Sequence, residues 1–314
     1  MEKHRLCIIV PCYNEEKVLP ITAELFLGKI KQLIEKDIIT DSSRVMFVND
    51  GSDDKTWQII KDLAKSDVHF IGISQSRNMG HQNALLAGLM EANGKFDITV
   101  SIDCDGQDDI DAIDKMITEY KNGSDVVYGV RYDRKNDSFF KRFTAETFYK
   151  LLKAFGVDIV FNHADYRLMS RRAVNALADF KEVNLFIRGL IPLVGFRSSV
   201  VYYERKERMA GDSHYRFKKM LGLAFDGITG LSVKPIRLIF SVGLFFVILS
   251  ALIGIVWAFL GKGYPLLPIV CLISFFGGLQ LSAIGIIGEY IGKTYLETKA
   301  RPRYIISEKT YNDF

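Results

Sequence analysis

The stretch Leu6-Cys7-Ile8-Ile9-Val10-Pro11-Cys12-Tyr13-Asn14-Glu15-Glu16 joins a run of five apolar residues to a polar turn, and a segment with helical spacing follows over Glu15–Glu35. This order of elements is the repeating unit of an α/β sheet. Further apolar runs follow at Val45–Val48, Val68–Ile73, Ile98–Ile102 and Val126–Val130. The segments between these runs have helical spacing, at Asp54–Lys65, Gly80–Ala92 and Asp108–Lys121. The alternation predicts a mostly parallel sheet with helices on both faces.

Carboxylates follow several of these apolar runs. In an open α/β sheet, ligands bind beyond the carboxyl ends of the strands. Asn49-Asp50-Gly51-Ser52 follows one run, and Asp103-Cys104-Asp105 follows another. A single carboxylate at such a place could simply cap a helix, so the convergence of several on one rim is what favours a binding site. Two carboxylates one residue apart can share a divalent cation, Mg²⁺ or Mn²⁺, with a diphosphate.

Two long apolar segments follow residue 235. Leu238–Leu260 contains no charged residue, and as a helix it would extend about 34 Å, enough to cross a hydrocarbon core of about 30 Å. Pro265–Gly288 is the second, and Glu289 ends it. One such segment could be a buried helix of a soluble protein, but two in series predict a transmembrane hairpin.

The charges around the hairpin predict its orientation. Lysines and arginines flank both ends of the hairpin, whereas Lys262 alone lies in the turn between the spans, so both chain ends are expected in the cytoplasm. The net charge of +4 is too small to indicate nucleic acid as a partner. The apolar run near the N-terminus is too short for a secretory signal. We therefore predict a cytoplasmic catalytic domain (1–212), an amphipathic juxtamembrane segment (213–235), a two-helix hairpin (236–292) and a cytoplasmic tail (293–314).

Five short motifs occur in an order that resembles a known family. They are Pro11-Cys12-Tyr13-Asn14-Glu15, Asn49-Asp50-Gly51-Ser52, Ser76-Arg77-Asn78-Met79-Gly80, Asp103-Cys104-Asp105 and Arg208-Met209-Ala210-Gly211-Asp212-Ser213. The chain resembles inverting GT-A glycosyltransferases of family two, and within them the polyprenyl-phosphate enzymes of the dolichol-phosphate mannose synthase type. The two C-terminal spans match the bacterial bactoprenol glucosyltransferase branch, which implies a bacterial plasma membrane.

The resemblance implies a role for particular residues. It assigns the nucleotide-sugar to Pro11, Tyr13, Glu15, Asp50, Asp103 and Arg131. It assigns the metal ion, Mg²⁺ or Mn²⁺, to Asp105 and Gln107. It implies that Asp165, matched to the proposed catalytic aspartate, and Asp103, beside the donor, are the catalytic residues. It places Arg131, Arg208 and Ser213 at the acceptor phosphate. The implied reaction moves one sugar from a nucleotide-sugar to a polyprenyl (undecaprenyl) phosphate among membrane lipids, with UDP-glucose as first donor and UDP-N-acetylglucosamine or GDP-mannose as alternatives.

The sequence departs from the family pattern at several positions. Asn49 stands where the family usually has aspartate, and His81 and His214 stand where lysine is frequent. Gly106 and Asp109 replace a hydrophobic residue and a proline after the paired aspartates. These changes leave the reaction class in place and put the choice of substrate in question.

Two other functions remain open from the sequence. A processive polysaccharide synthase is one, although such relatives usually carry a QxxRW motif that does not occur here. A non-catalytic membrane subunit is the other, because the glycine-rich second span could pack against other helices or a second copy of the chain. The paired aspartates argue against a purely structural role.

Overall fold

The structure, a computed structural model, describes residues 3–131, 163–204 and 266–312, together with 228–230 and scattered positions between 232 and 252. Its strands are β1 (Leu6–Cys12), β2 (Arg44–Asn49), β3 (Phe70–Gln75), β4 (Ile98–Ser101), β5 (Val126–Arg131), β6 (His163–Ser170), β7 (Ser198–Tyr203) and β8 (Ile306–Lys309). Its helices are α1 (Leu19–Glu35), α2 (Thr56–Ser66), α3 (His81–Ala92), α4 (Ala112–Lys121), α6 (Arg171–Ala178), α7 (Ile187–Leu193) and α10 (Leu266–Lys299).

The described strands form one mixed sheet in the order β7-β5-β6-β4-β1-β2-β3-β8. The pairs β1–β2, β1–β4, β2–β3 and β5–β7 are parallel, and β6 and β8 pair antiparallel with their neighbours. The α/β, GT-A-like class with a mostly parallel sheet is therefore confirmed, and the five strands predicted near the N-terminus are all present.

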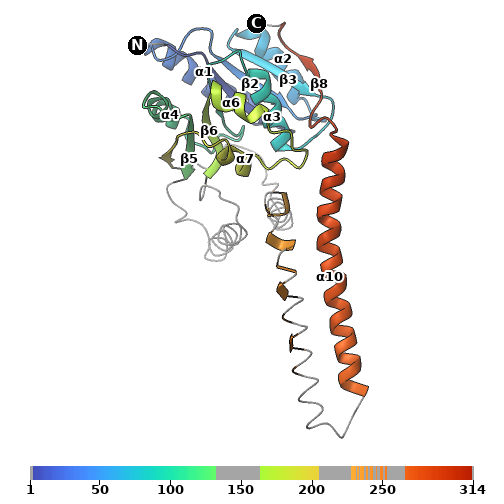
Figure 1. Cartoon of the computed structure of the whole chain (residues 1–314). Coiled ribbons are helices and arrows are strands. Elements are labelled where there is room, and N and C mark those ends of the chain that lie inside the picture. Colours follow the sequence, from blue (N-terminus) through green and yellow to red (C-terminus); the bar gives the residue numbers. More distant parts are fainter. Residues whose placement is uncertain are drawn as a thin grey trace.

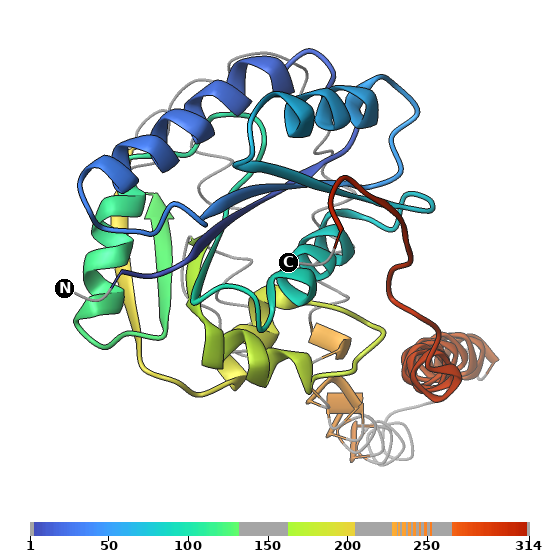
Figure 2. The same ribbon diagram turned by 90° about the horizontal axis from the view of Figure 1, so that it is seen from above.

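Alternate residues of the central strand face opposite sides of the sheet, and each side has its own core. Ile8 belongs to the cluster packed under α1 and α4, whereas its neighbour Ile9 belongs to the cluster packed under α3, α6 and α7. Figure 2 shows these two helical layers on either side of the twisted sheet. Because β1 is buried on both faces, its run of apolar residues does not alternate with polar ones.

Helix α3 lies unusually close to β1, and Gly88 makes this approach possible. A Cβ atom on Gly88 would lie 2.5 Å from Ile9 Cγ2 and 2.9 Å from Val48 Cγ2. We therefore expect Gly88→Ala to lower the free energy of unfolding by about 1–3 kcal/mol through overpacking. Denaturant unfolding of the purified protein would measure this change.

Gly28 on α1 provides the matched control, since a Cβ atom there meets nothing within 4 Å. Gly28→Ala is expected to raise stability by about 0.5–1 kcal/mol through helix propensity. If Gly88→Ala proved as stable as the wild type, the close packing of α3 on β1 would be wrong.

Helix α10 projects from the domain that contains the sheet; its C-terminal end lies at that domain, and the chain continues from there into β8 (Figure 1). After α10, β8 pairs antiparallel with β3 at the edge of the sheet. By length and composition, α10 is the one helix among the described residues that could cross a membrane, and none of its apolar window is buried. The expected second apolar helix is thus present, whereas Leu238–Leu260 lies largely outside the described residues.

Candidate active site

The paired aspartates stand at the carboxyl end of β4. Gly106, with φ +69°, reverses the chain directly after them, and the amide of Gln107 donates to Asp105 Oδ1 at 3.1 Å. This turn keeps Asp103 and Asp105 on the rim of the sheet. The parallel pairing of β1 with β2 and β4 places the segments after β1 and β2 on the same rim.

Asp165 reaches this rim from the opposite direction. It lies near the start of β6, which pairs antiparallel with β4, so the beginning of β6 lies beside the end of β4. The hydroxyl of Ser101 donates to the backbone oxygen of Asp165 at 2.6 Å. The structure thus brings Asp103 and Asp165 together, although Asp165 is distant in sequence.

Two arginines hold the Asp165 carboxylate. Arg167 donates to Oδ1 at 2.6 Å, and Arg188 donates to Oδ1 at 3.1 Å and to Oδ2 at 2.8 Å. Burial raises the pKa of Asp165, but the positive charges of Arg188 and Arg167 and the contact with His81 lower it well below its ordinary value. Asp165 is therefore ionised at neutral pH and is a weak proton acceptor.

His81, at the start of α3, bridges the two aspartates. Its Nε2 lies 3.6 Å from Asp103 Oδ1 and 3.5 Å from Asp165 Oδ2. Desolvation lowers the pKa of His81, but the two carboxylates raise it to about 8 overall. The histidine is therefore largely protonated at neutral pH and supplies the positive charge that lysine supplies in the family pattern.

A divalent cation fits the chemistry of this rim. Desolvation raises the pKa of Asp103 to about 6, and the nearby carboxylates of Asp108, Asp165 and Asp105 add to the effect while His81 opposes it. The rim thus carries crowded negative charge. No group of three potential ligands is preassembled among the described residues. Mg²⁺ typically takes one or two protein carboxylates and completes its shell with water and substrate phosphates, so Asp105 and Gln107 remain the predicted ligands.

Arg131, at the end of β5, forms a cluster with Asp108 and Tyr203. Its Nη2 lies 3.3 Å from Asp108 Oδ1, and its Nε donates to the Tyr203 hydroxyl at 3.3 Å. Tyr203 in turn donates to Asp108 Oδ1 at 2.5 Å, while Asp108 Oδ2 is buried with no hydrogen-bond partner in the described structure. The cluster fixes Arg131 at the rim, where its role toward phosphate stays a prediction.

The predicted nucleotide residues lie after β1 and β2. Tyr13 is 41% exposed, and the amide of Glu15 donates to Thr56 Oγ1 at 2.8 Å. Pro11 is buried within β1. Asp50 is buried as well, and its two oxygens accept from the amides of Met79 at 2.8 Å and Gly80 at 2.9 Å. In this structure Asp50 therefore shapes the loop that leads into α3, and its contact with the nucleoside remains a prediction.

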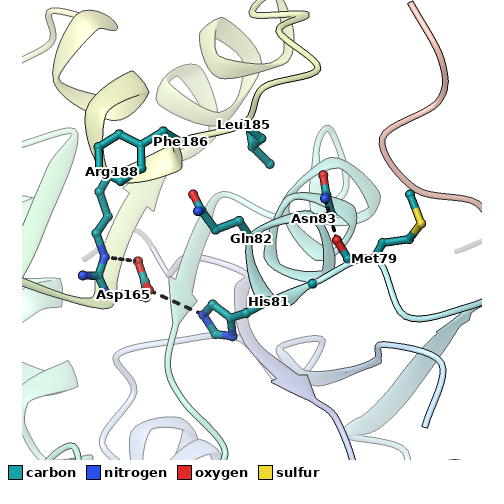
Figure 3. Close-up of a pocket in the computed structure, with 9 residues that line it drawn as sticks. Met79, His81, Gln82, Asn83, Asp165, Leu185, Phe186 and Arg188 are labelled. Carbon is teal, nitrogen blue, oxygen red and sulfur yellow. Dashed lines mark hydrogen bonds and ion pairs between the residues drawn. The ribbon is translucent and has the colours of Figure 1, made fainter. Parts of the chain in front are cut away.

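A cavity of about 250 Å³ opens beside Asp165, between α3 and α7 (Figure 3). Its lining comes from the start of α3 and the two residues before it, from β6 and from the 185–188 segment, namely Met79, Gly80, His81, Gln82, Asn83, Asp165, Leu185, Phe186 and Arg188. Arg188 points from α7 toward Asp165, and His81 approaches the same carboxylate from the other side. A small polar molecule held here would face an anionic group flanked by cations.

Sequence reasoning did not single out Arg167 or Arg188. A signal was present for Arg188 alone, which is a charged residue within the apolar stretch Leu185–Ile191. Arg167 lies two residues from Asp165 in a polar stretch, where a buried ion pair has no distinctive sequence pattern. Arg208 and Ser213, predicted at the acceptor phosphate, lie outside the described residues.

Comparisons with known proteins place the chain among glycosyltransferases. A family model described as "Glycosyl transferase family 2" matches residues 7–178. A glycosyltransferase of Bacillus subtilis (strain 168), YkoT, is 45% identical over 98% of this chain and 93% of its own length. The bactoprenol glucosyl transferase of Shigella phage SfX is 40% identical over 97% of this chain and 99% of its own length. Among solved structures, a mannosyltransferase from Pyrobaculum calidifontis, in complex with GDP-Man and Mn²⁺, is 18% identical over 94% of this chain and 86% of that one, with a TM-score of 0.43.

Proposed function

The chain belongs to glycosyl transferase family 2, and we propose that it transfers one glucose from UDP-glucose to a polyprenyl phosphate at the cytoplasmic face of a membrane. The observation that carries the proposal is the meeting of Asp103, Asp105 and the arginine-held Asp165 on one rim. The likeness to a bactoprenol glucosyl transferase over nearly the whole chain supports the acceptor and the sugar.

On the donor side, the segments after β1 and β2 receive the nucleoside. Asp105 and Gln107 would hold the divalent cation, and Asp103 faces the donor. When bound, such a cation neutralises charge on the departing nucleotide diphosphate. The residues of the rim orient the anomeric carbon toward Asp165 and His81.

On the acceptor side, the phosphate oxygen attacks the anomeric carbon in a single displacement that inverts its configuration. The C1–O bond to the nucleotide diphosphate breaks as the new C1–O bond to the lipid phosphate forms. A phosphate monoester has a second pKa of about 6, so it is largely deprotonated at neutral pH and needs no strong base. The lowered pKa of Asp165 accords with this, and its charge instead orients the sugar and stabilises positive charge at the anomeric carbon. Arg131, Arg208 and Ser213 bind the acceptor phosphate.

The hairpin brings this site to the lipid. A polyprenyl chain loses about 0.8 kcal/mol for each CH₂ group that leaves the bilayer, so the enzyme must approach the phosphate at the membrane surface. Large apolar side chains of α10 are exposed, including Ile273, Leu281 and Ile284. We propose that α10 pairs with Leu238–Leu260 as two spans of a plasma membrane, that both chain ends are cytoplasmic, and that the juxtamembrane segment lies in the headgroup region.

A panel of labelled donors tests the proposal. Purified protein in lipid–detergent micelles would receive UDP-glucose, UDP-N-acetylglucosamine or GDP-mannose, with and without undecaprenyl phosphate. We expect label from UDP-glucose to enter the organic phase only when the lipid phosphate is present. Transfer that is independent of the lipid, or no transfer from any donor, would show the proposed function to be wrong.

A further inference from the structure

The segment between α6 and α7 connects the end of α10 to the candidate active site. Residues 179–186 form no helix or strand of their own. The segment is held by groups that are distant in sequence: Arg303 donates to the backbone oxygen of Phe180 at 2.8 Å, and Gln82 Oε1 accepts from the amide of Ile187 at 2.8 Å. Its conformation therefore depends on the elements that surround it.

Glu297, in the last turn of α10, makes the most extensive of these contacts. One carboxylate oxygen accepts from the amide of Val183 at 2.8 Å, and the other accepts from both the amide and the side-chain nitrogen of Asn184, each at 2.8 Å. The Asn184 side chain also lies 3.5 Å from the backbone oxygen of Lys293 on the same helix. A single carboxylate thus fixes two consecutive residues of the segment with three hydrogen bonds, which are stronger than neutral ones because the acceptor is charged.

The fixed residues lead directly into the site. Leu185 and Phe186 line the cavity, and Arg188, four residues after Asn184, makes the two-point contact with Asp165. Ile187, between them, is fully buried, so the segment has little freedom to move without moving Arg188. Only a short stretch of chain thus separates the end of α10 from the group that holds Asp165.

We propose that Glu297 is a positioning residue that holds the 183–188 segment so that Arg188 keeps its two-point contact with Asp165. The inference rests on the proposed function, since it concerns the same site. It makes the geometry around Asp165 depend on how α10 is seated relative to the catalytic domain. Glu297 itself touches neither sugar nor phosphate.

The test is a double-mutant cycle on turnover. Glu297→Ala is expected to lower kcat by about ten- to a hundred-fold, because a displacement of about 1 Å at a reacting group can cost this much, while the KM for UDP-glucose stays unchanged. If Glu297 acts through Arg188, Glu297→Ala will have no additional effect on kcat in an Arg188→Ala background. A merely structural role predicts independent losses together with a lower unfolding temperature.

Glu289→Ala is the matched control on the same helix, where the carboxylate pairs with Lys293 at 3.8 Å and not with the 183–188 segment. Its kcat should equal that of the wild type. Asn184→Asp is a second variant in case Glu297→Ala fails to fold. It removes the side-chain N–H group that donates to Glu297 and places a second negative charge beside that carboxylate. It should show the same loss confined to kcat.

The outcomes separate this inference from the function on which it rests. A wild type that transfers no sugar to polyprenyl phosphate overturns the proposed function. If the wild type is active and Glu297→Ala is fully active as well, the positioning role alone is wrong. The same holds if the loss of kcat caused by Glu297→Ala adds to the loss caused by Arg188→Ala.

Discussion

Asp165→Asn is expected to lower kcat by about 10³-fold while leaving the affinity for UDP-glucose unchanged. Asparagine has the size of aspartate but lacks its charge, so the cleft would lose the anionic group that faces the developing positive charge at the anomeric carbon. The substitution also removes the negative partner of Arg167, which is fully buried, and of Arg188. Single-turnover kinetics together with titration of UDP-glucose would measure both parts of this expectation.

Asp97→Asn is the control for this variant. Asp97 also pairs with an arginine, Arg171 at 2.7 Å, but it precedes β4 and so lies at the opposite end of that strand from Asp103. Its kcat should be close to that of the wild type. If Asp165→Asn retained near-normal turnover with intact binding, the catalytic role of Asp165 would be wrong.

Asp105→Asn is expected to reduce turnover by a similar factor, about 10³-fold. It is also expected to raise the concentration of Mg²⁺ or Mn²⁺ that is needed to activate the enzyme. An amide is a weaker ligand than a carboxylate for a hard cation, and the charge of the diphosphate would then be poorly offset. The measurement is the initial rate as a function of metal concentration at saturating donor. A variant that activates at the same metal concentration as the wild type, with full rate, would remove Asp105 from the metal site.

Asp109→Asn makes the same chemical change four residues further along the same loop. Asp109 replaces a proline of the family pattern, so its carboxylate is not expected to serve the metal. Its metal dependence should match that of the wild type, which would separate loss of a ligand from a general loss of charge on the rim.

The sheet could be predicted from sequence where its strands are apolar. The runs that became β1 to β5 are buried, and their hydrophobic content is the signal that strand prediction uses. Two other strands lack this signal for different reasons. β6 contains Asp165 and Arg167, a buried ion pair whose polarity resembles that of a loop. β8 is an edge strand with the sequence Ile-Ser-Glu-Lys, and main-chain bonds to β3 hold it in place.

The candidate site could likewise be predicted from the sequence only in part. The aspartates after β4 could be placed on the rim because they follow an apolar strand directly. The place of Asp165 beside Asp103 could not be derived from the pattern, since it requires an antiparallel strand between β4 and β5. Arg188 contacts Asp165, and Glu297 contacts Asn184, across more than 20 residues of sequence. Local periodicity carries no information about such contacts.

Mass spectrometry can identify the lipid that purified protein forms from UDP-glucose, undecaprenyl phosphate and Mg²⁺. We predict a product with the mass of undecaprenyl phosphate plus one hexose, which disappears when the metal is chelated or the lipid is omitted. A lipid carrying a series of hexoses, or UDP release that proceeds equally without the lipid, would show that this rim does not transfer a single sugar to a polyprenyl phosphate.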